Sequence, residues 1–78
     1  MAQYNGHRSW NAWNISLWIN NDESLYMFAR DCMTANNGNR WKAARAFMVH
    51  GGMDGEKTPD GARYNVTCVY EAMEGMLD

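Results

Sequence analysis

The chain of 78 residues has few features that anchor or reinforce a small protein: it has one proline, two cysteines and no long apolar run. No stretch approaches the ~18 apolar residues of a transmembrane helix, and Met1–His7 lacks the basic start and apolar stretch of a secretory signal. We therefore expect a cytoplasmic protein without membrane contact. Cys32 and Cys68 are then expected to be buried thiols, and a Cys32–Cys68 disulfide is the alternative.

Charge of a single sign is also scarce, because seven Lys and Arg residues stand against nine Asp and Glu residues. The net charge of −2 is too small for a generic nucleic-acid binder or a mimic of a nucleic acid. Its distribution is uneven: residues 1–53 hold five basic and three acidic residues, whereas residues 54–78 hold two basic and six acidic ones. We expect a dipolar surface, which suits a protein partner better than a polyanion.

The length and composition predict one small folded domain spanning residues 1–78, in which the polar residues 1–8 form a flexible arm. Apolar residues make up 46% of the chain, which is typical of a globular protein. A core of this size rarely supplies more than ~3–5 kcal/mol of stability without reinforcement. The four Trp, four Tyr, two Phe and seven Met residues indicate that large core side chains supply this reinforcement. Reinforcement by a partner chain is left as an open alternative.

Helical periodicity predicts three helices in the first two thirds of the chain. One spans about residues 9–20 with Ser9 as its N-cap, and a second spans about 22–34 after the capping segment Asn20–Asp22. A third follows the turn Thr34–Asn39 and ends at Gly51-Gly52.

The remaining third of the chain is less clear. Residues 53–63 contain Thr58-Pro59-Asp60-Gly61 and are expected to form a loop. The apolar spacing from Val66 to Leu77 favours a fourth helix capped by Asn65, although alternation from Tyr64 to Tyr70 leaves open a short strand before a shorter helix. We therefore predict a mainly α fold, a compact bundle of about four short helices, with a short strand or hairpin at 54–68 as the open alternative.

Residues that would indicate chemistry are sparse. His7 and His50 are far apart and neither has a Cys, Asp or Glu at ligand spacing, so we predict no metal site. The glycine-rich segment Gly51–Gly55 lacks the Lys-Ser/Thr pair of a phosphate-binding loop. We predict no catalytic residue and no cofactor.

The aromatic residues are more informative, because Trp, Tyr and Arg most often dominate binding interfaces. The expected core contains six large residues: Trp13, Leu17, Trp18, Phe28, Trp41 and Phe47. Some of the remaining aromatic residues should then be partly exposed, among them Tyr4, Trp10, Tyr26, Tyr64 and Tyr70. With the basic side of the third helix, they make the predicted partner-binding residues Arg40, Lys42, Arg45, Trp10 and Tyr26.

Asn14 falls on the apolar face of the first helix, between tryptophans. A buried amide must be hydrogen-bonded. We expect a structural role for Asn14, with a partner in the Asn20–Asp22 turn or at another helix end.

The first helix also carries a resemblance. Residues 10–22 resemble the Trp-Asn-Val-x-Leu-Trp-Ile-x-Asn-Asp segment of a family of small, uncharacterised proteins encoded by phages and other mobile elements. The matching residues are Trp13, Asn14, Leu17, Trp18, Ile19, Asn21 and Asp22, followed by Glu23, Leu25, Tyr26 and Cys32 and later by Thr58-Pro59-Asp60-Gly61. The resemblance implies an origin in a bacterial host and supplies no mechanism.

Small acidic phage proteins without enzymatic residues often inhibit bacterial defence by binding, as anti-CRISPR proteins do. The resemblance therefore implies a non-enzymatic inhibitor that binds a host protein or ribonucleoprotein and occludes its functional site. Two alternatives remain. The second and third helices with Arg40, Lys42 and Arg45 would suit a helix-turn-helix DNA-binding regulator, and the surplus aromatic residues would suit a self-associating structural protein that buries them in a homodimer.

Overall fold

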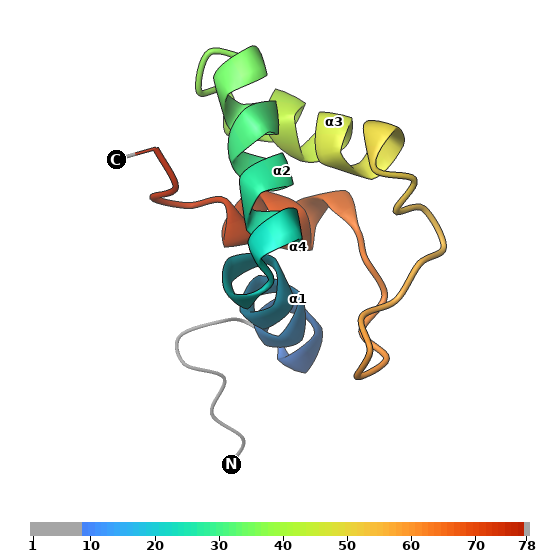
Figure 1. The fold of residues 1–78 in the computed structure, drawn as a ribbon. Coiled ribbons are helices and arrows are strands. Elements are labelled where there is room, and N and C mark those ends of the chain that lie inside the picture. The colour runs from blue at the N-terminus through green and yellow to red at the C-terminus, as the bar shows by residue number, and fades with distance from the viewer. Residues whose placement is uncertain (1–8, 78) are drawn as a thin grey trace.

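The computed structural model describes residues 9–77, which form four helices (Figure 1). These are α1 (Trp10–Asn21), α2 (Glu23–Ala35), α3 (Arg40–His50) and α4 (Val66–Ala72). The mainly α prediction is therefore confirmed. The predicted flexible arm, residues 1–8, lies outside the described residues.

Each helix begins at a side chain that caps it. Ser9, Asp22, Asn39 and Asn65 each accept a hydrogen bond from the backbone N–H three residues ahead. Such caps satisfy N–H groups that have no partner within the helix. The predicted starts of α1 and α4 at Ser9 and Asn65 are confirmed. Capping residues can be recognised from the neighbouring sequence alone.

The end of α4 differs from the expectation. The helical spacing extends to Leu77, yet α4 ends at Ala72, and Gly75 adopts a positive φ of 77°. The chain nevertheless stays on the core, because Met73 and Met76 are buried. The apolar spacing beyond residue 72 therefore marks a turn that packs inward rather than a continued helix.

The alternative of a strand or hairpin at 54–68 is wrong. Among residues 9–77 the only β pairing is one isolated antiparallel bridge between Lys57 and Arg63. The segment closes into a loop through the backbone bonds of Thr58 to Ala62 and of Tyr64 to Glu56.

The helices form a ring in which each packs on the next and α4 returns to α1 (Figure 1). Within the described part of the chain, α1 and α3 do not pack against each other. The centre is filled mainly by small and aliphatic side chains around one phenylalanine: Ala12, Ile15, Ile19, Ala29, Cys32, Met33, Ala43, Ala44, Phe47, Ala62, Tyr64, Cys68, Val69, Ala72, Met73 and Met76.

This core corrects the expected one. Of the six large residues assigned to it, only Phe47 is buried, while Trp13, Trp18 and Phe28 are half-buried. Leu17 and Trp41 are exposed, at 37% and 46%. Buried alanines and aliphatic side chains fill the centre instead, and a closely packed core leaves little space for an indole ring.

Both cysteines are buried thiols rather than a disulfide, which confirms the expectation for Cys32 and Cys68. Burial raises the pKa of Cys32 above its ordinary value, with a smaller contribution from the charge of Asp31. None of the described helices is long and apolar enough to cross a membrane.

Buried polar groups join the loop to α1. The Thr58 hydroxyl donates to Asn14 Oδ1 at 2.6 Å and accepts from the Ala62 N–H at 3.0 Å. Asn14 Nδ2 and Trp18 Nε1 each donate to Asp60 Oδ2 at 2.9 Å. The expected hydrogen-bonded, structural role of Asn14 is confirmed, but the expected partner is wrong, because the bonds go to the distant loop rather than to the Asn20–Asp22 turn.

A second contact fixes the same loop one turn earlier on α1. Asn11 accepts from the Arg63 N–H at 3.1 Å and donates to the Arg63 carbonyl at 3.0 Å. An amide that satisfies both backbone groups of one residue acts as a β-strand neighbour would. The loop is thus held to α1 in its middle, at Thr58 and Asp60, and at its C-terminal end, at Arg63.

Asp60 makes this attachment sensitive to pH. Hydrogen bonds from Asn14 and then from Trp18 hold the pKa of Asp60 below its ordinary value, against a smaller opposing effect of burial. A carboxyl group whose pKa is lower in the folded state stabilises the fold above its unfolded pKa, about 3.9. That stabilisation is lost as the pH falls through the folded pKa.

Asp60→Asn is therefore expected to lower the thermal unfolding midpoint at neutral pH, and the gap to wild type should close below about pH 4. Thermal melts at a series of pH values measure it. If the difference in unfolding midpoint between wild type and Asp60→Asn stays constant as the pH falls, the charge of Asp60 contributes nothing to stability.

Candidate functional site

The structure brings together part of the predicted partner-binding set. Arg40, Lys42 and Arg45 lie on α3, where Lys42 and Arg45 are exposed. Trp10 is 39% exposed but lies at the start of α1, on the helix that does not pack against α3 in the described structure. Tyr26 lies on α2 with the Arg30 guanidinium 5.9 Å from its ring centroid. The five residues are thus distributed over three helices, of which α2 packs against α3 and α1 does not.

The exposed side of α3 carries a stripe that is neither purely polar nor purely apolar. Trp41, Arg45 and Val49 occur four residues apart and are all exposed, Val49 to 74%. Residues at i, i+4 and i+8 share one side of a helix. The stripe thus places an indole, a guanidinium and an aliphatic side chain in a row.

At its Trp41 end the stripe meets α4. The indole of Trp41 stacks on the ring of Tyr70, with centroids 4.1 Å apart and planes 16° from parallel. The Arg40 guanidinium lies 4.0 Å from the Tyr70 centroid and 3.7 Å from the Glu74 carboxylate. Stacking and cation–π contacts fix the orientation of these rings. We call Arg40, Trp41, Tyr70 and Glu74 the aromatic cluster.

At its Val49 end the stripe borders a groove of about 580 Å³. The groove lies between the C-terminal half of α3 and the segment that leads into α4. Its lining is mainly apolar and includes three charged residues; the lining residues are Arg45, Met48, Val49, Asp54, Arg63, Tyr64, Asn65 and Val66. The groove and the aromatic cluster together are called the α3–α4 face.

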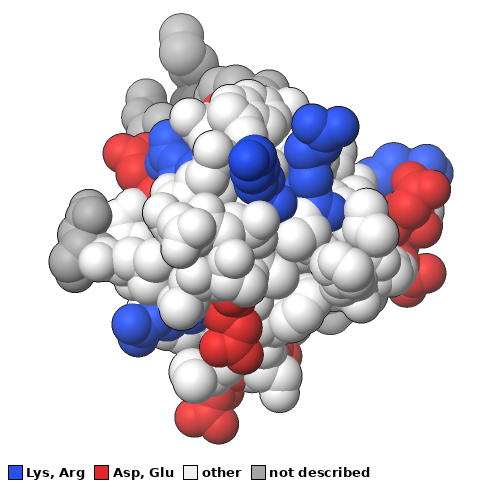
Figure 2. Space-filling view, turned by 90° about the horizontal axis from the view of Figure 1, so that it is seen from above, with Lys and Arg blue, Asp and Glu red and all other residues white. Residues whose placement is uncertain are grey.

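The α3–α4 face carries a small excess of positive charge although the whole chain is acidic. Arg40, Arg45 and Arg63 stand against Asp54 and Glu74. Lys42, outside the face as defined, is a further exposed basic residue on α3. Figure 2 views the molecule from above and shows Lys and Arg side chains in a row across the upper half, with acidic side chains near the ends of the row. Uncharged surface separates the central basic side chains. The face is therefore a mixed basic and apolar surface rather than a continuous cationic one.

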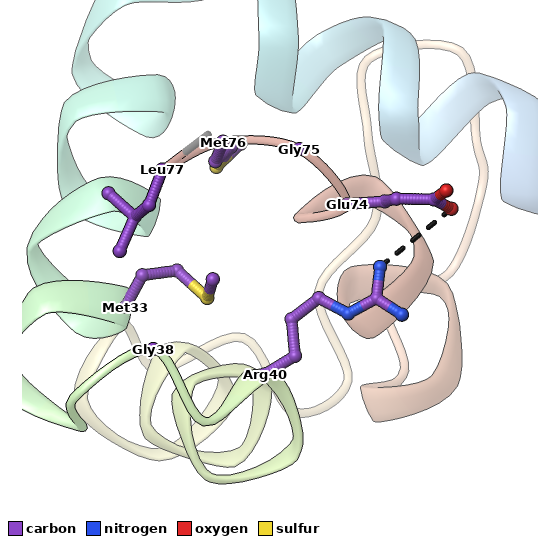
Figure 3. A pocket seen from close by; sticks show the side chains of 7 residues that line it. All are labelled: Met33, Gly38, Arg40, Glu74, Gly75, Met76 and Leu77. Carbon is purple, nitrogen blue, oxygen red and sulfur yellow. Dashed lines mark ion pairs between the residues drawn. The ribbon is translucent and has the colours of Figure 1, made fainter.

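A second cavity of about 450 Å³ is also lined by Arg40. It lies where the end of α2, the start of α3 and the turn after α4 meet (Figure 3). Its lining is Met33, Gly38, Arg40, Glu74, Gly75, Met76 and Leu77. The Arg40–Glu74 ion pair forms one wall in Figure 3. Arg40 thus connects this cavity to the aromatic cluster.

Within residues 9–77, no group of three or more His, Cys, Asp or Glu side chains is placed to hold a metal ion. His50 is exposed at the end of α3. His7 lies outside the described residues. What the α3–α4 face offers is contact area, stacking and charge.

The fold and the face define a class: a small four-helix protein with an exposed aromatic and basic surface. The chain belongs to a family of unknown function, DUF7249, whose model matches residues 1–78. Neither the curated proteins nor the solved structures contain a match to the chain. Family membership therefore supports the expected relationship to uncharacterised proteins. The family carries no known function, so the α3–α4 face is the feature that bears on function.

Two parts of this face are absent from the sequence-based set. Trp41 was assigned to the core, yet its spacing of four residues from Arg45 and of eight from Val49 is visible in the sequence and indicates a shared exposed side. Tyr70 and the groove carry no such signal. They depend on α4 packing beside α3, which local spacing does not encode.

Proposed function

We propose that the protein is a non-enzymatic inhibitor that binds a bacterial defence protein or ribonucleoprotein in the host cytoplasm and occludes its functional site, as anti-CRISPR proteins do. The α3–α4 face is the proposed contact surface. The choice of bacterial defence follows from the resemblance of residues 10–22 and 58–61 to proteins of phages and other mobile elements.

One observation carries the choice of surface: Trp41 is stacked on Tyr70 and is still 46% exposed. Its orientation is set before any partner arrives, so binding would immobilise few side chains. Ordered aromatic residues beside arginine are the groups that most often dominate protein interfaces. A partner that covers Trp41 would also remove its remaining apolar surface from water.

A DNA-binding role is less well supported by the same face. A duplex is held mainly by cationic contacts to phosphate. Arg40 is already paired with Glu74, which leaves Lys42 and Arg45 on α3, with the exposed apolar residues Trp41 and Val49 on either side of them in the sequence.

Trp41→Ser is expected to abolish inhibition of the defence target while leaving the fold intact, because the indole is nearly half exposed. The measurement is the efficiency of phage plaquing on bacteria that carry defined defence systems and express the protein. Met27→Ser on α2 is the matched control, because Met27 is 52% exposed. Wild type and Met27→Ser should raise plaquing on one of these strains, and Trp41→Ser should not, because the loss of an interface residue worth ~1.4 kcal/mol weakens binding about tenfold.

Equal activity of wild type and Trp41→Ser would contradict the proposed surface. Failure of the wild type to protect phage against any system in the panel would contradict the proposed function. Salt-sensitive binding to duplex DNA by the wild type would favour the DNA-binding alternative.

A further inference from the structure

We infer that the groove of the α3–α4 face receives an apolar side chain from an acidic segment of the partner protein, an inference that rests on the proposed function. The walls of the groove support the apolar anchor. Met48, Val49, Tyr64 and Val66 line it, and its volume of about 580 Å³ exceeds what one large side chain needs. Its residues are adjacent to the stripe that begins at Trp41, so one partner segment can cross both.

The groove is already formed without an occupant. Both backbone groups of Arg63 are hydrogen-bonded to Asn11, and the Tyr64 N–H donates to the Glu56 carbonyl at 3.0 Å. Asn65 caps α4 by accepting from the Cys68 N–H at 2.9 Å. The wall opposite α3 is therefore held at three consecutive residues. A preformed site requires little ordering on binding, which favours a short segment as the occupant.

The charged residues of the groove support the acidic character of that segment. Among its lining residues, Arg45 and Arg63 stand against a single carboxylate, Asp54, and all three are exposed. Charges more than about 8–10 Å apart are largely screened at physiological salt. The local excess of positive charge therefore decides partner choice at the groove, even though the chain carries a net charge of −2.

Three synthetic peptides labelled with fluorescein test the inference by anisotropy with the intact protein. The first, Glu-Asp-Leu-Phe-Glu-Asp, carries both features; Glu-Asp-Ser-Ser-Glu-Asp lacks the apolar anchor; Lys-Arg-Leu-Phe-Lys-Arg reverses the charge. We expect the first peptide to bind at least about tenfold more tightly than either other peptide, a difference of ~1.4 kcal/mol. Amide NMR shifts on titration should cluster at residues 45–49 and 63–66.

The double variant Arg45→Glu/Arg63→Glu should reverse the order of the two charged peptides. Both side chains are exposed, and the bonds of Arg63 to Asn11 use its backbone, so the fold should be retained. Arg30→Glu on α2, also exposed, is the matched control and should keep the wild-type order.

Equal binding of the three peptides, or amide shifts centred away from the groove, would overturn the inference. Concentration-dependent dimerisation through the groove in the absence of peptide would also overturn it, in favour of a second copy as the occupant. If peptide binding fails while Trp41→Ser still abolishes inhibition of defence, the inference falls and the proposed function stands. If the peptides bind as expected but wild type inhibits no defence system, the proposed function falls and the chemistry of the groove stands.

Discussion

Phe47→Ala is expected to leave the protein largely unfolded. Phe47 is fully buried, and its ring centroid lies 5.2 Å from that of Phe28 and 6.4 Å from that of Tyr64. Removing a buried phenylalanine side chain costs ~3–5 kcal/mol. A core in a chain of this length rarely supplies more than ~3–5 kcal/mol in total. Far-ultraviolet circular dichroism and urea titration measure the loss.

Val49→Ala is the control for Phe47→Ala, because it shortens a side chain on the same helix that is 74% exposed. It should change stability by less than about 0.5 kcal/mol. A cooperatively folded Phe47→Ala protein with near wild-type stability would show that the helices do not pack around this ring.

Asn14→Leu is expected to lower the free energy of unfolding by ~1–3 kcal/mol, although it adds apolar surface to a buried position. Leucine cannot accept from the Thr58 hydroxyl or donate to Asp60 Oδ2. The loss leaves a buried hydroxyl without its acceptor, and buried polar groups are costly without partners. Urea unfolding of Asn14→Leu and of Thr58→Val gives the two losses, which should not add in the double variant because the residues share one bond.

Asn20→Leu supplies the comparison on the same helix. Asn20 is exposed, and its side chain donates within α1 to the Ser16 carbonyl at 2.9 Å and to the Ser16 hydroxyl at 3.3 Å. Its replacement should change stability by less than about 0.5 kcal/mol. Unchanged or increased stability of Asn14→Leu would show that the polar contact between α1 and the loop is dispensable.

The parts of the fold that follow from neighbouring residues were predictable. Ser9 and Asn65 are recognisable caps, and Gly51 follows the last residue of α3. The mainly α class follows from these local signals.

The parts that depend on distant residues were not. Trp41 shares one side of α3 with Arg45 and Val49, but the stacking of its indole on Tyr70 depends on α4, which is distant in the sequence. Asn14 and Thr58-Pro59-Asp60-Gly61 both belong to the resemblance, but nothing in their spacing shows that they meet. Their contact assigns a structural role to this part of the resemblance, which is loop attachment.

The candidate site divides in the same way. The basic side of α3 was identified from sequence because Arg40, Lys42 and Arg45 lie within two helical turns. Trp10 and Tyr26 were grouped with them by residue type, and residue type does not show that α2 packs against α3 whereas α1 does not.

The central claim, that the α3–α4 face contacts a partner protein, is tested most directly by photo-crosslinking in bacteria that carry the defence system identified by plaquing. A photoreactive phenylalanine derivative replaces Val49 in one variant and Met27 on α2 in another, since both positions are exposed. We expect position 49 to give a discrete adduct with a component of that defence system, identified by mass spectrometry, and position 27 to give none. An adduct from position 27 alone, or an adduct from position 49 with a second copy of this chain, would contradict it.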